Sequence, residues 1–434
     1  MFTFFRSDFF HFEFLRLIGV APLGGADIAE CLESRSLIRE NDAESWYQAW
    51  SKTAKHAESL AREAVSAGDA EGARWAFIRA SNYARAAQFM LHTDKHDPRI
   101  KAGMEQSITY FLNALPFMES PVVQVNIPYQ DTKNPKVEVE LPGYLYLPPE
   151  ASRLSGKIPV IINSGGLDST QEELYYYLPA GATRRGYAVL TFEGPGQGIV
   201  CARDGLTNIP DWEVVTDAVA DRLQSFAQER PDLELDMGRV AIVGASTGGY
   251  FALRAAKNPL FKAAVCIDGT YDFILVMKQR LPSWFYNGWQ SGWLGPGFIN
   301  AVIKFICRLD FKSRWEFNHL QWAFGVNSPY EALNFLKRYT LRLDDGGEYL
   351  RRVKCPVLVT GATDTLYFPP EVSTQYIYDA LDHLPDDKRE IWVPKGPGSG
   401  GLQAKVAALS VSHQRTCAFL DRHLGIQRPA LNIN

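Results

Sequence analysis

One serine of this chain lies in a sequence context suited to nucleophilic catalysis. Residues 244–248 read Gly-Ala-Ser-Thr-Gly, which is the pattern Gly-x-Ser-x-Gly centred on Ser246. An apolar, β-rich run precedes the pattern at 239–243, and a helix-like run follows it at 251–256. A sharp turn between a strand and a helix would expose the Ser246 hydroxyl. Ser246 is therefore the candidate nucleophile, and the alternative is a glycine-rich turn that only closes on packed backbone.

A serine nucleophile also needs N–H donors that stabilise the oxyanion formed on the substrate. Residues 163–169 read Asn-Ser-Gly-Gly-Leu-Asp-Ser and follow an apolar run, so their small side chains would let backbone amides approach a substrate. We expect the first donor to be the amide of Gly166, with Leu167 as the alternative. The second would be the amide of Thr247, which directly follows the nucleophile. An ordinary tight turn is the competing interpretation of this loop.

Three carboxylates follow predicted strands and could assist. Asp364 comes after the apolar run 357–360, which would place it at the same sheet edge as Ser246, and we assign it as the acid. Asp268, after the run 263–267, is the alternative acid or a structural hydrogen-bonding residue. Glu193 precedes a Gly-Pro turn and would either act on the substrate or accept backbone N–H bonds.

The expected general base is missing from its usual place. In the chain order Ser, Asp, His, the histidine should follow the last strand, but residues 394–405 contain none. His413 falls well inside the predicted terminal helix, where we expect it to be partly exposed. A base for ordinary serine hydrolysis would then have to come from His413 or from His319, which lies in a long segment between two predicted strands.

The elements that would position these residues form an α/β pattern. Residues 42–115 have helical periodicity, and 122–127 and 136–141 alternate as antiparallel strands do. Six short apolar runs separated by helices then predict a mostly parallel sheet covered on both faces. They lie at 158–162, 188–192, 240–243, 263–267, 356–360 and 390–393. An antiparallel start followed by parallel strands is the order of an alpha/beta-hydrolase fold.

We therefore predict four parts. These are an N-terminal helical domain at 1–120, a first core part at 121–274, a helical cap insertion at 275–345 and a second core part at 346–434. The cap segment contains many aromatic residues, which would either line the active site or form the cap's own core.

Composition excludes several function classes. The 434 residues have a net charge of -4, so nothing indicates a nucleic-acid partner or an anionic membrane surface. Six widely spaced cysteines predict buried free thiols in a reducing compartment and no metal site. We also expect no cofactor. The Phe-rich residues 2–14 are interrupted by charges and do not form a signal peptide. We expect a cytoplasmic enzyme, and the Phe-rich segment would pack on a subdomain or in a homodimer.

On these motifs the chain resembles the alpha/beta hydrolases that include 2,6-dihydroxypseudooxynicotine hydrolase and fungal heptaketide pigment hydrolases. The resemblance extends over nearly the whole chain and is strongest to hydrolase-like members of fungal polyketide clusters, including cytochalasan-type pathways. Its carriers are the Phe-rich start, residues 24–28, 165–169 and 192–198, and the Ser246 turn. Members of this family have a histidine before the terminal helix, and residues 403–406, Gln-Ala-Lys-Val, occupy its place.

The resemblance implies that Ser246 and Asp364, assisted by Glu193, act on a carbonyl of a polyketide-type small molecule. It also implies that Gln403 replaces the catalytic histidine. A glutamine cannot accept a proton near neutral pH, so C–C or ester hydrolysis would be weakened. Cyclisation or condensation, which needs mainly carbonyl polarisation, would be less affected. The alternative from another class is a catalytically silent binding or scaffold protein with this fold.

Overall fold

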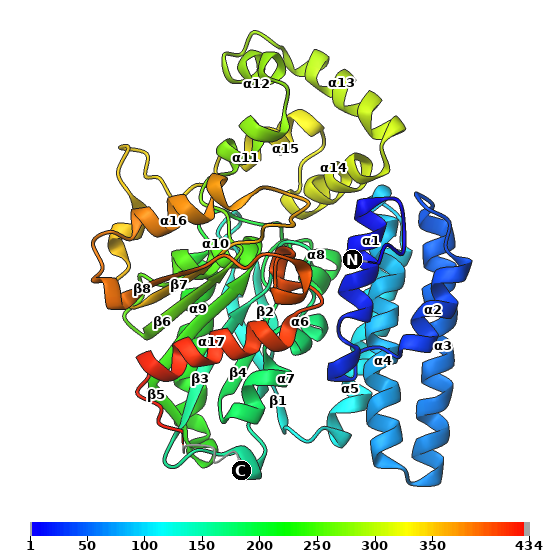
Figure 1. Cartoon of the computed structure of the whole chain (residues 1–434), viewed down its shortest axis with the longest axis vertical. Coiled ribbons are helices and arrows are strands. Elements are labelled where there is room, and N and C mark those ends of the chain that lie inside the picture. Colours follow the sequence, from blue (N-terminus) through cyan, green and yellow to red (C-terminus); the bar gives the residue numbers. More distant parts are fainter. Residues whose placement is uncertain (1, 429–434) are drawn as a thin grey trace.

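The computed structural model describes residues 2–428, and within them eight strands form one sheet (Figure 1). Their order is β1-β2-β4-β3-β5-β6-β7-β8. The strands are β1 (Val122–Gln130), β2 (Glu138–Tyr146), β3 (Ile158–Ser164), β4 (Ala188–Phe192), β5 (Leu235–Ala245), β6 (Phe261–Ile267), β7 (Val357–Thr360) and β8 (Arg389–Trp392). β2 runs antiparallel to β1 and β4, and the remaining pairs are parallel. The predicted antiparallel start and mostly parallel sheet are confirmed.

The sheet is buried on both faces, which explains the unbroken apolar runs in the sequence. The helices of this part are α6 (Gln171–Tyr177), α7 (Pro179–Ala182), α8 (Gly198–Asp204), α9 (Glu213–Glu229), α10 (Thr247–Ala255), α16 (Thr374–Ala380) and α17 (Leu409–His423). In β3, Val160 and Ile162 join the core packed by α9 and α10, whereas Ile161 joins the opposite core packed by α7 and α17.

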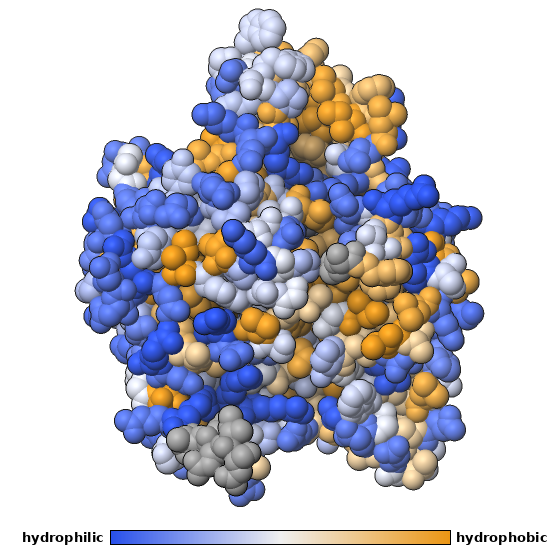
Figure 2. Space-filling view, in the orientation of Figure 1, coloured by the Kyte–Doolittle hydropathy of each residue, from blue (hydrophilic) through white to orange (hydrophobic). Residues whose placement is uncertain are grey.

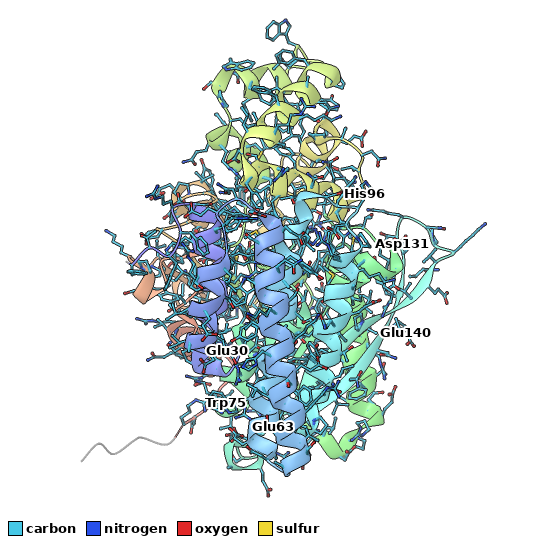
Figure 3. All side chains as sticks on the ribbon, turned by 90° about the vertical axis from the view of Figure 1, so that its right-hand side faces the viewer. Glu30, Glu63, Trp75, His96, Asp131 and Glu140 are labelled. Carbon is cyan, nitrogen blue, oxygen red and sulfur yellow. The ribbon has the colours of Figure 1, made fainter. Side chains whose placement is uncertain are left out.

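An N-terminal group of helices stands beside the sheet, on the right of Figure 1 and facing the viewer in Figure 3. It comprises α1 (Asp8–Ile18), α2 (Ile28–Leu37), α3 (Ala43–Ala67), α4 (Ala70–Phe89) and α5 (Arg99–Ala114). In α3, Ala54, Ala57 and Ala61 lie three or four residues apart and are all buried, as one face of a packed helix should be.

The Phe-rich start of the chain packs into this helical group. Phe5 and Phe10 are almost fully buried and contact the Trp46 ring edge-on or at a tilt, at centroid distances of 6.4 and 5.4 Å. Phe2, in contrast, is 74% exposed. Burial within its own chain explains most of the segment's aromatic content, so the segment supplies no argument for a dimer.

Five helices lie between β6 and β7, above the sheet in Figure 1. They are α11 (Phe273–Arg280), α12 (Ser283–Gln290), α13 (Pro296–Leu309), α14 (Phe311–Phe324) and α15 (Pro329–Leu336). We call them the cap helices. Trp315 of α14 packs in the N-terminal aromatic cluster, and its indole N–H donates to the Phe89 carbonyl at 2.7 Å. This contact ties the cap helices to the N-terminal helices.

All six cysteines fall within the described residues and have free thiols. Cys31, Cys201, Cys266 and Cys417 are buried as expected, but Cys307 and Cys355 are only half-buried because they lie on outer helix or loop positions. Among residues 2–428, no helix is both long enough and apolar enough to cross a membrane.

Candidate active site

Ser246 occupies the turn between β5 and α10. Its backbone has φ 57° and ψ -129°, a conformation that is uncommon for a residue with a side chain and characteristic of functional turns. A Cβ added at Gly248 would lie 2.5 Å from the Ser164 carbonyl oxygen, and one added at Gly244 would overlap the Gly248 backbone. The two glycines of the motif are therefore required by close backbone packing.

The hydroxyl of Ser246 has no hydrogen-bond partner among residues 2–428, although its amide donates to the Ile267 carbonyl at 2.8 Å. A serine in a working triad donates this hydroxyl proton to an imidazole. Ser246 therefore has the backbone conformation of a nucleophile turn, and its hydroxyl is available to contact a ligand.

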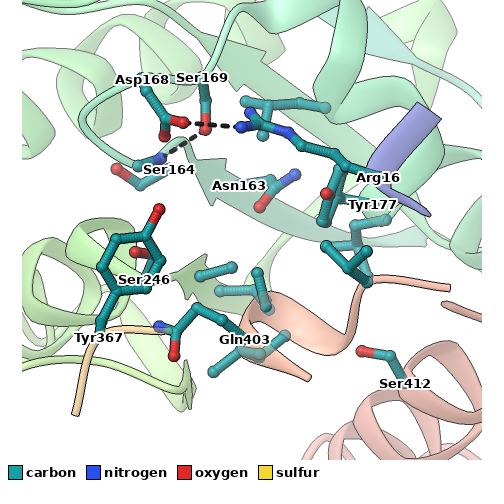
Figure 4. A pocket seen from close by; sticks show the side chains of 18 of the residues that line it. Arg16, Asn163, Ser164, Asp168, Ser169, Tyr177, Ser246, Tyr367, Gln403 and Ser412 are labelled. Atoms are coloured by element: carbon teal, nitrogen blue, oxygen red, sulfur yellow. Dashed lines mark hydrogen bonds and ion pairs between the residues drawn. The ribbon is translucent and has the colours of Figure 1, made fainter. Parts of the chain in front are cut away.

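Two connected pockets meet at Ser246. Asp168, Ser246 and Tyr367 line both of them. One extends toward α1 and Gln403, and the other extends beneath the cap helices and has a volume of about 130 Å³. Figure 4 shows the first pocket, with Tyr367 and Gln403 beside Ser246 and Arg16 reaching Asp168 across the cavity.

The loop after β3 presents backbone amides near Ser246. A Cβ on Gly166 would lie 3.6 Å from the Ser246 Cβ, so the backbone passes directly over the serine. The Gly166 N–H, which we expected to donate to the oxyanion, instead donates to Ser169 Oγ at 3.0 Å. Leu167 and Thr247 both line the pocket beneath the cap helices. Because Thr247 is the first residue of α10, its amide lacks an intrahelical acceptor.

Gln403 lies in the pocket with Ser246, whereas Asp364 does not line it. The Gln403 side chain is 3% exposed and has two fixed partners. Its Oε1 accepts from Thr365 Oγ1 at 3.1 Å, and its Nε2 donates to the Asp268 carbonyl at 3.0 Å. Asp364 is exposed, and its carboxylate accepts from Thr363 Oγ1 and from the Gly396 amide. Residue 403 and Asp364 are therefore not hydrogen-bonded to each other.

Asp268, the alternative acid, has a structural partner. Its Oδ1 accepts from Lys405 Nζ at 2.8 Å and from Thr360 Oγ1 at 2.7 Å, and both charged side chains are essentially fully buried. Burial lowers the pKa of Lys405 below its usual range. This ion pair holds the loop that carries Gln403, in which Ala404, Lys405 and Ala407 all have positive φ.

Glu193 is also buried away from the two pockets at Ser246. Its carboxylate accepts from the Gln171 amide at 2.9 Å and from the Ile199 amide at 2.7 Å, at the starts of α6 and α8. Burial raises its pKa to about 7, and burial together with Glu193 raises the pKa of Glu172 to about 8. The contacts favour the structural alternative, in which Glu193 shapes the turn.

The two histidines considered as bases differ in position. His413 is 2% exposed, which corrects the expectation of a partly exposed residue, because its ring packs on Gly181 and faces the Tyr176 and Tyr177 carbonyls. His319 of α14 does line the pocket beneath the cap helices, together with Ser246. Burial lowers its pKa to about 4, and its Nε2 is buried without a hydrogen-bond partner among the described residues.

Two residues that pattern analysis missed complete the site. Arg16 of α1 donates to Asp168 Oδ2 at 2.7 Å and to both oxygens of Glu173. Tyr367 follows β7 and lines both pockets, and burial raises the pKa of its hydroxyl well above the usual range. It therefore remains a neutral donor. Nothing in the spacing of either residue indicates a site, because both reach it from distant elements.

Comparisons with known proteins agree with this architecture. The chain is 47% identical to hydrolase acrC of Aspergillus aculeatus over 99% of both chains. It is 44% identical to the 20-hydroxy-prefusarin hydrolase FUS2 of Gibberella moniliformis, over 98% of this chain and 99% of that protein. The structure of 2,6-dihydroxy-pseudo-oxynicotine hydrolase has the same fold, with a TM-score of 0.67 at 21% identity over 94% of this chain and 95% of that one. A model of the alpha/beta hydrolase family matches residues 160–407, and the chain belongs to that family.

Proposed function

We propose that this protein binds a polyketide-type small molecule and promotes a non-hydrolytic cyclisation or condensation at one of its carbonyls. The observation that carries the proposal is the Ser246 hydroxyl, which borders both pockets and has no hydrogen-bonded base among residues 2–428. The residue in the place of the usual histidine is Gln403, which cannot accept a proton. Two fungal relatives are named hydrolases, one of them a 20-hydroxy-prefusarin hydrolase, and these names support a small-molecule substrate of this class.

The site offers hydrogen-bond donors to a carbonyl oxygen. Leu167, Ser246, Thr247 and Tyr367 all line the same pocket, and their donors are two backbone amides, a hydroxyl and a phenol. Donors fixed before the reaction stabilise the negative charge that develops on the carbonyl oxygen. A substrate carbon between two carbonyl groups could then attack in its enol form: the C–C bond forms while the enol proton passes to the oxygen of the attacked carbonyl, which becomes a hydroxyl group. The protein supplies polarisation and orientation for this step.

Hydrolysis with His319 as base is the second candidate. It is favoured by the unpartnered Nε2 of His319 and by its place on the pocket wall. Because burial lowers the pKa of His319 to about 4, the imidazole is neutral at physiological pH but is a weak base.

The test incubates the purified protein with a keto-amide polyketide intermediate and with p-nitrophenyl esters in isotopically labelled water. We expect a cyclised product, lighter by one water if dehydration follows, with no labelled oxygen from solvent and little ester cleavage. Ser246→Ala and Tyr367→Phe should slow that conversion, whereas a distant control, Ser66→Ala, should not.

Two outcomes would contradict the proposal. Solvent label in a cleaved product, lost in His319→Ala, would support serine hydrolysis. No conversion of any intermediate, combined with no fluorophosphonate labelling of Ser246, would instead support a binding or scaffold protein.

A further inference from the structure

The cap helices enclose a cavity of their own. It lies among α11, α12, α13, α14 and α15 and has a volume of about 300 Å³, more than twice that of the pocket beneath them. Its lining is mainly aliphatic and aromatic, with Leu281, Phe285, Val302, Ile303, Phe317 and Leu333 on its walls. A space of this size and lining favours an apolar ligand over a polar one.

This cap cavity continues into the pocket at Ser246. Five residues line both spaces, and they are Met277, Arg280, Glu316, Leu320 and Leu336. At this junction Arg280 Nη2 donates to Glu316 Oε2 at 2.8 Å, and Lys312 Nζ lies 3.8 Å from Glu316 Oε1. The ion pair therefore lies at the junction of two spaces that are both lined mainly by apolar side chains, and it places charge between them.

The outer end of the cap cavity is apolar and open. Trp284 and Ile306 line the cavity yet are 56% and 43% exposed. Figure 2 shows hydrophobic surface over α13 at the upper right of the molecule. The exposed apolar residues on α13 itself include Phe298, Phe305 and Leu309. Exposed apolar clusters of this kind on a soluble fold commonly mark sites of ligand or partner contact.

We propose that the cap cavity binds the apolar chain of the substrate, while the carbonyl-bearing head of the same molecule lies at Ser246. This inference rests on the proposed function and adds the substrate class, a molecule with a polar, carbonyl-rich head and a long apolar chain. The continuity of the two spaces supports one ligand that crosses the junction. The Arg280–Glu316 pair stands where the head ends, and its remaining N–H donors can contact an oxygen substituent there.

The test measures binding, because binding does not depend on turnover. Methyl alkyl ketones, from methyl butyl ketone to methyl dodecyl ketone, are titrated calorimetrically into the full-length protein. If the chain enters an apolar cavity, affinity should rise about two- to fourfold per added methylene until the cavity is full.

Two variants place bulk in the cavity. Val302→Trp fills it from α13. Ile306→Trp narrows its exposed mouth, and because Ile306 is 43% exposed, the larger side chain has room in solvent and should leave folding intact. Both should abolish the gain in affinity for long ketones and leave short ketones unchanged. Phe305→Trp is the matched control, because Phe305 is 59% exposed on the same helix and does not line the cavity.

The outcomes separate this inference from the proposed function. A chain-length dependence that Val302→Trp and Ile306→Trp remove supports the tail site, even if no intermediate is converted. The tail site is refuted if affinity does not rise with chain length. It is also refuted if Val302→Trp, Ile306→Trp and the Phe305→Trp control change affinity equally, even when the conversion that depends on Ser246 is intact.

Discussion

Replacement of Arg16 by methionine tests how α1 supports the loop after β3 at the candidate active site. The guanidinium is 7% exposed and makes ion pairs with Asp168 at 2.7 Å and Glu173 at 2.5 Å. Removing it leaves two carboxylates near the pocket without their closest counter-charge, although Arg85 remains 3.4 Å from Glu173. Removing one partner of a buried ion pair typically costs about 3–5 kcal/mol, and we expect a loss of that size in the free energy of unfolding at pH 7.

The loss should depend on pH. Burial acts to raise the pKa of Asp168, but Arg16 outweighs it and holds that pKa below its ordinary value of 3.8. A carboxylate with a depressed pKa stabilises the fold above its unfolded pKa and loses this contribution as pH falls through its folded pKa. The difference between the parent and Arg16→Met should therefore be largest above about pH 4 and shrink below it.

The assay is urea unfolding, followed by both tryptophan fluorescence and far-ultraviolet circular dichroism. Arg62→Met is the matched control, because Arg62 is 67% exposed and pairs with Glu58 on the same helix. An exposed pair of this kind contributes less than about 1 kcal/mol. Equal losses in Arg16→Met and Arg62→Met would refute the reasoning.

Three further predictions concern buried charges and the missing base. Burial raises the pKa of Glu13 to about 7, so between about pH 4.5 and 7 the folded protein holds a proton that the unfolded chain releases, and stability falls as pH rises. Glu13→Gln should flatten this fall, measured as Tm against pH. Above pH 7 the variant should gain up to about 3 kcal/mol in the free energy of unfolding. Lys405→Met should lose about 3–5 kcal/mol of unfolding free energy, because the buried Asp268 carboxylate is left without its counter-charge. The control Lys304→Met, at an exposed position, should lose less than about 1 kcal/mol, and equal losses in the two variants would contradict the prediction. Gln403→His should raise the rate of p-nitrophenyl ester hydrolysis less than about tenfold, because the Asp364 carboxylate is hydrogen-bonded to Thr363 and Gly396 and does not orient the new imidazole. A larger gain would show that Asp364 can turn toward it.

Local features of the chain were sufficient to predict the sheet and the Ser246 turn. The run at 188–192 coincides with β4, and the run at 158–162 lies within β3, which continues to Ser164, since a strand buried on both faces is mostly apolar. Gly244 and Gly248 likewise indicated a sharp turn, because only glycine permits the close backbone approach found at both positions. Both features depend on residues that are close in the sequence, so a sequence pattern is enough to predict them.

The environment of each charged side chain was decided by tertiary structure. Arg16 meets Asp168 across 152 residues, and Lys405 meets Asp268 across 137 residues. The burial of His413 and the place of His319 in the pocket wall likewise depend on helices that pack from elsewhere in the chain. The sequence by itself determined where the turn and the absent histidine fall. Only folding decided which groups face Ser246, because burial and ion pairing arise from contacts between distant segments.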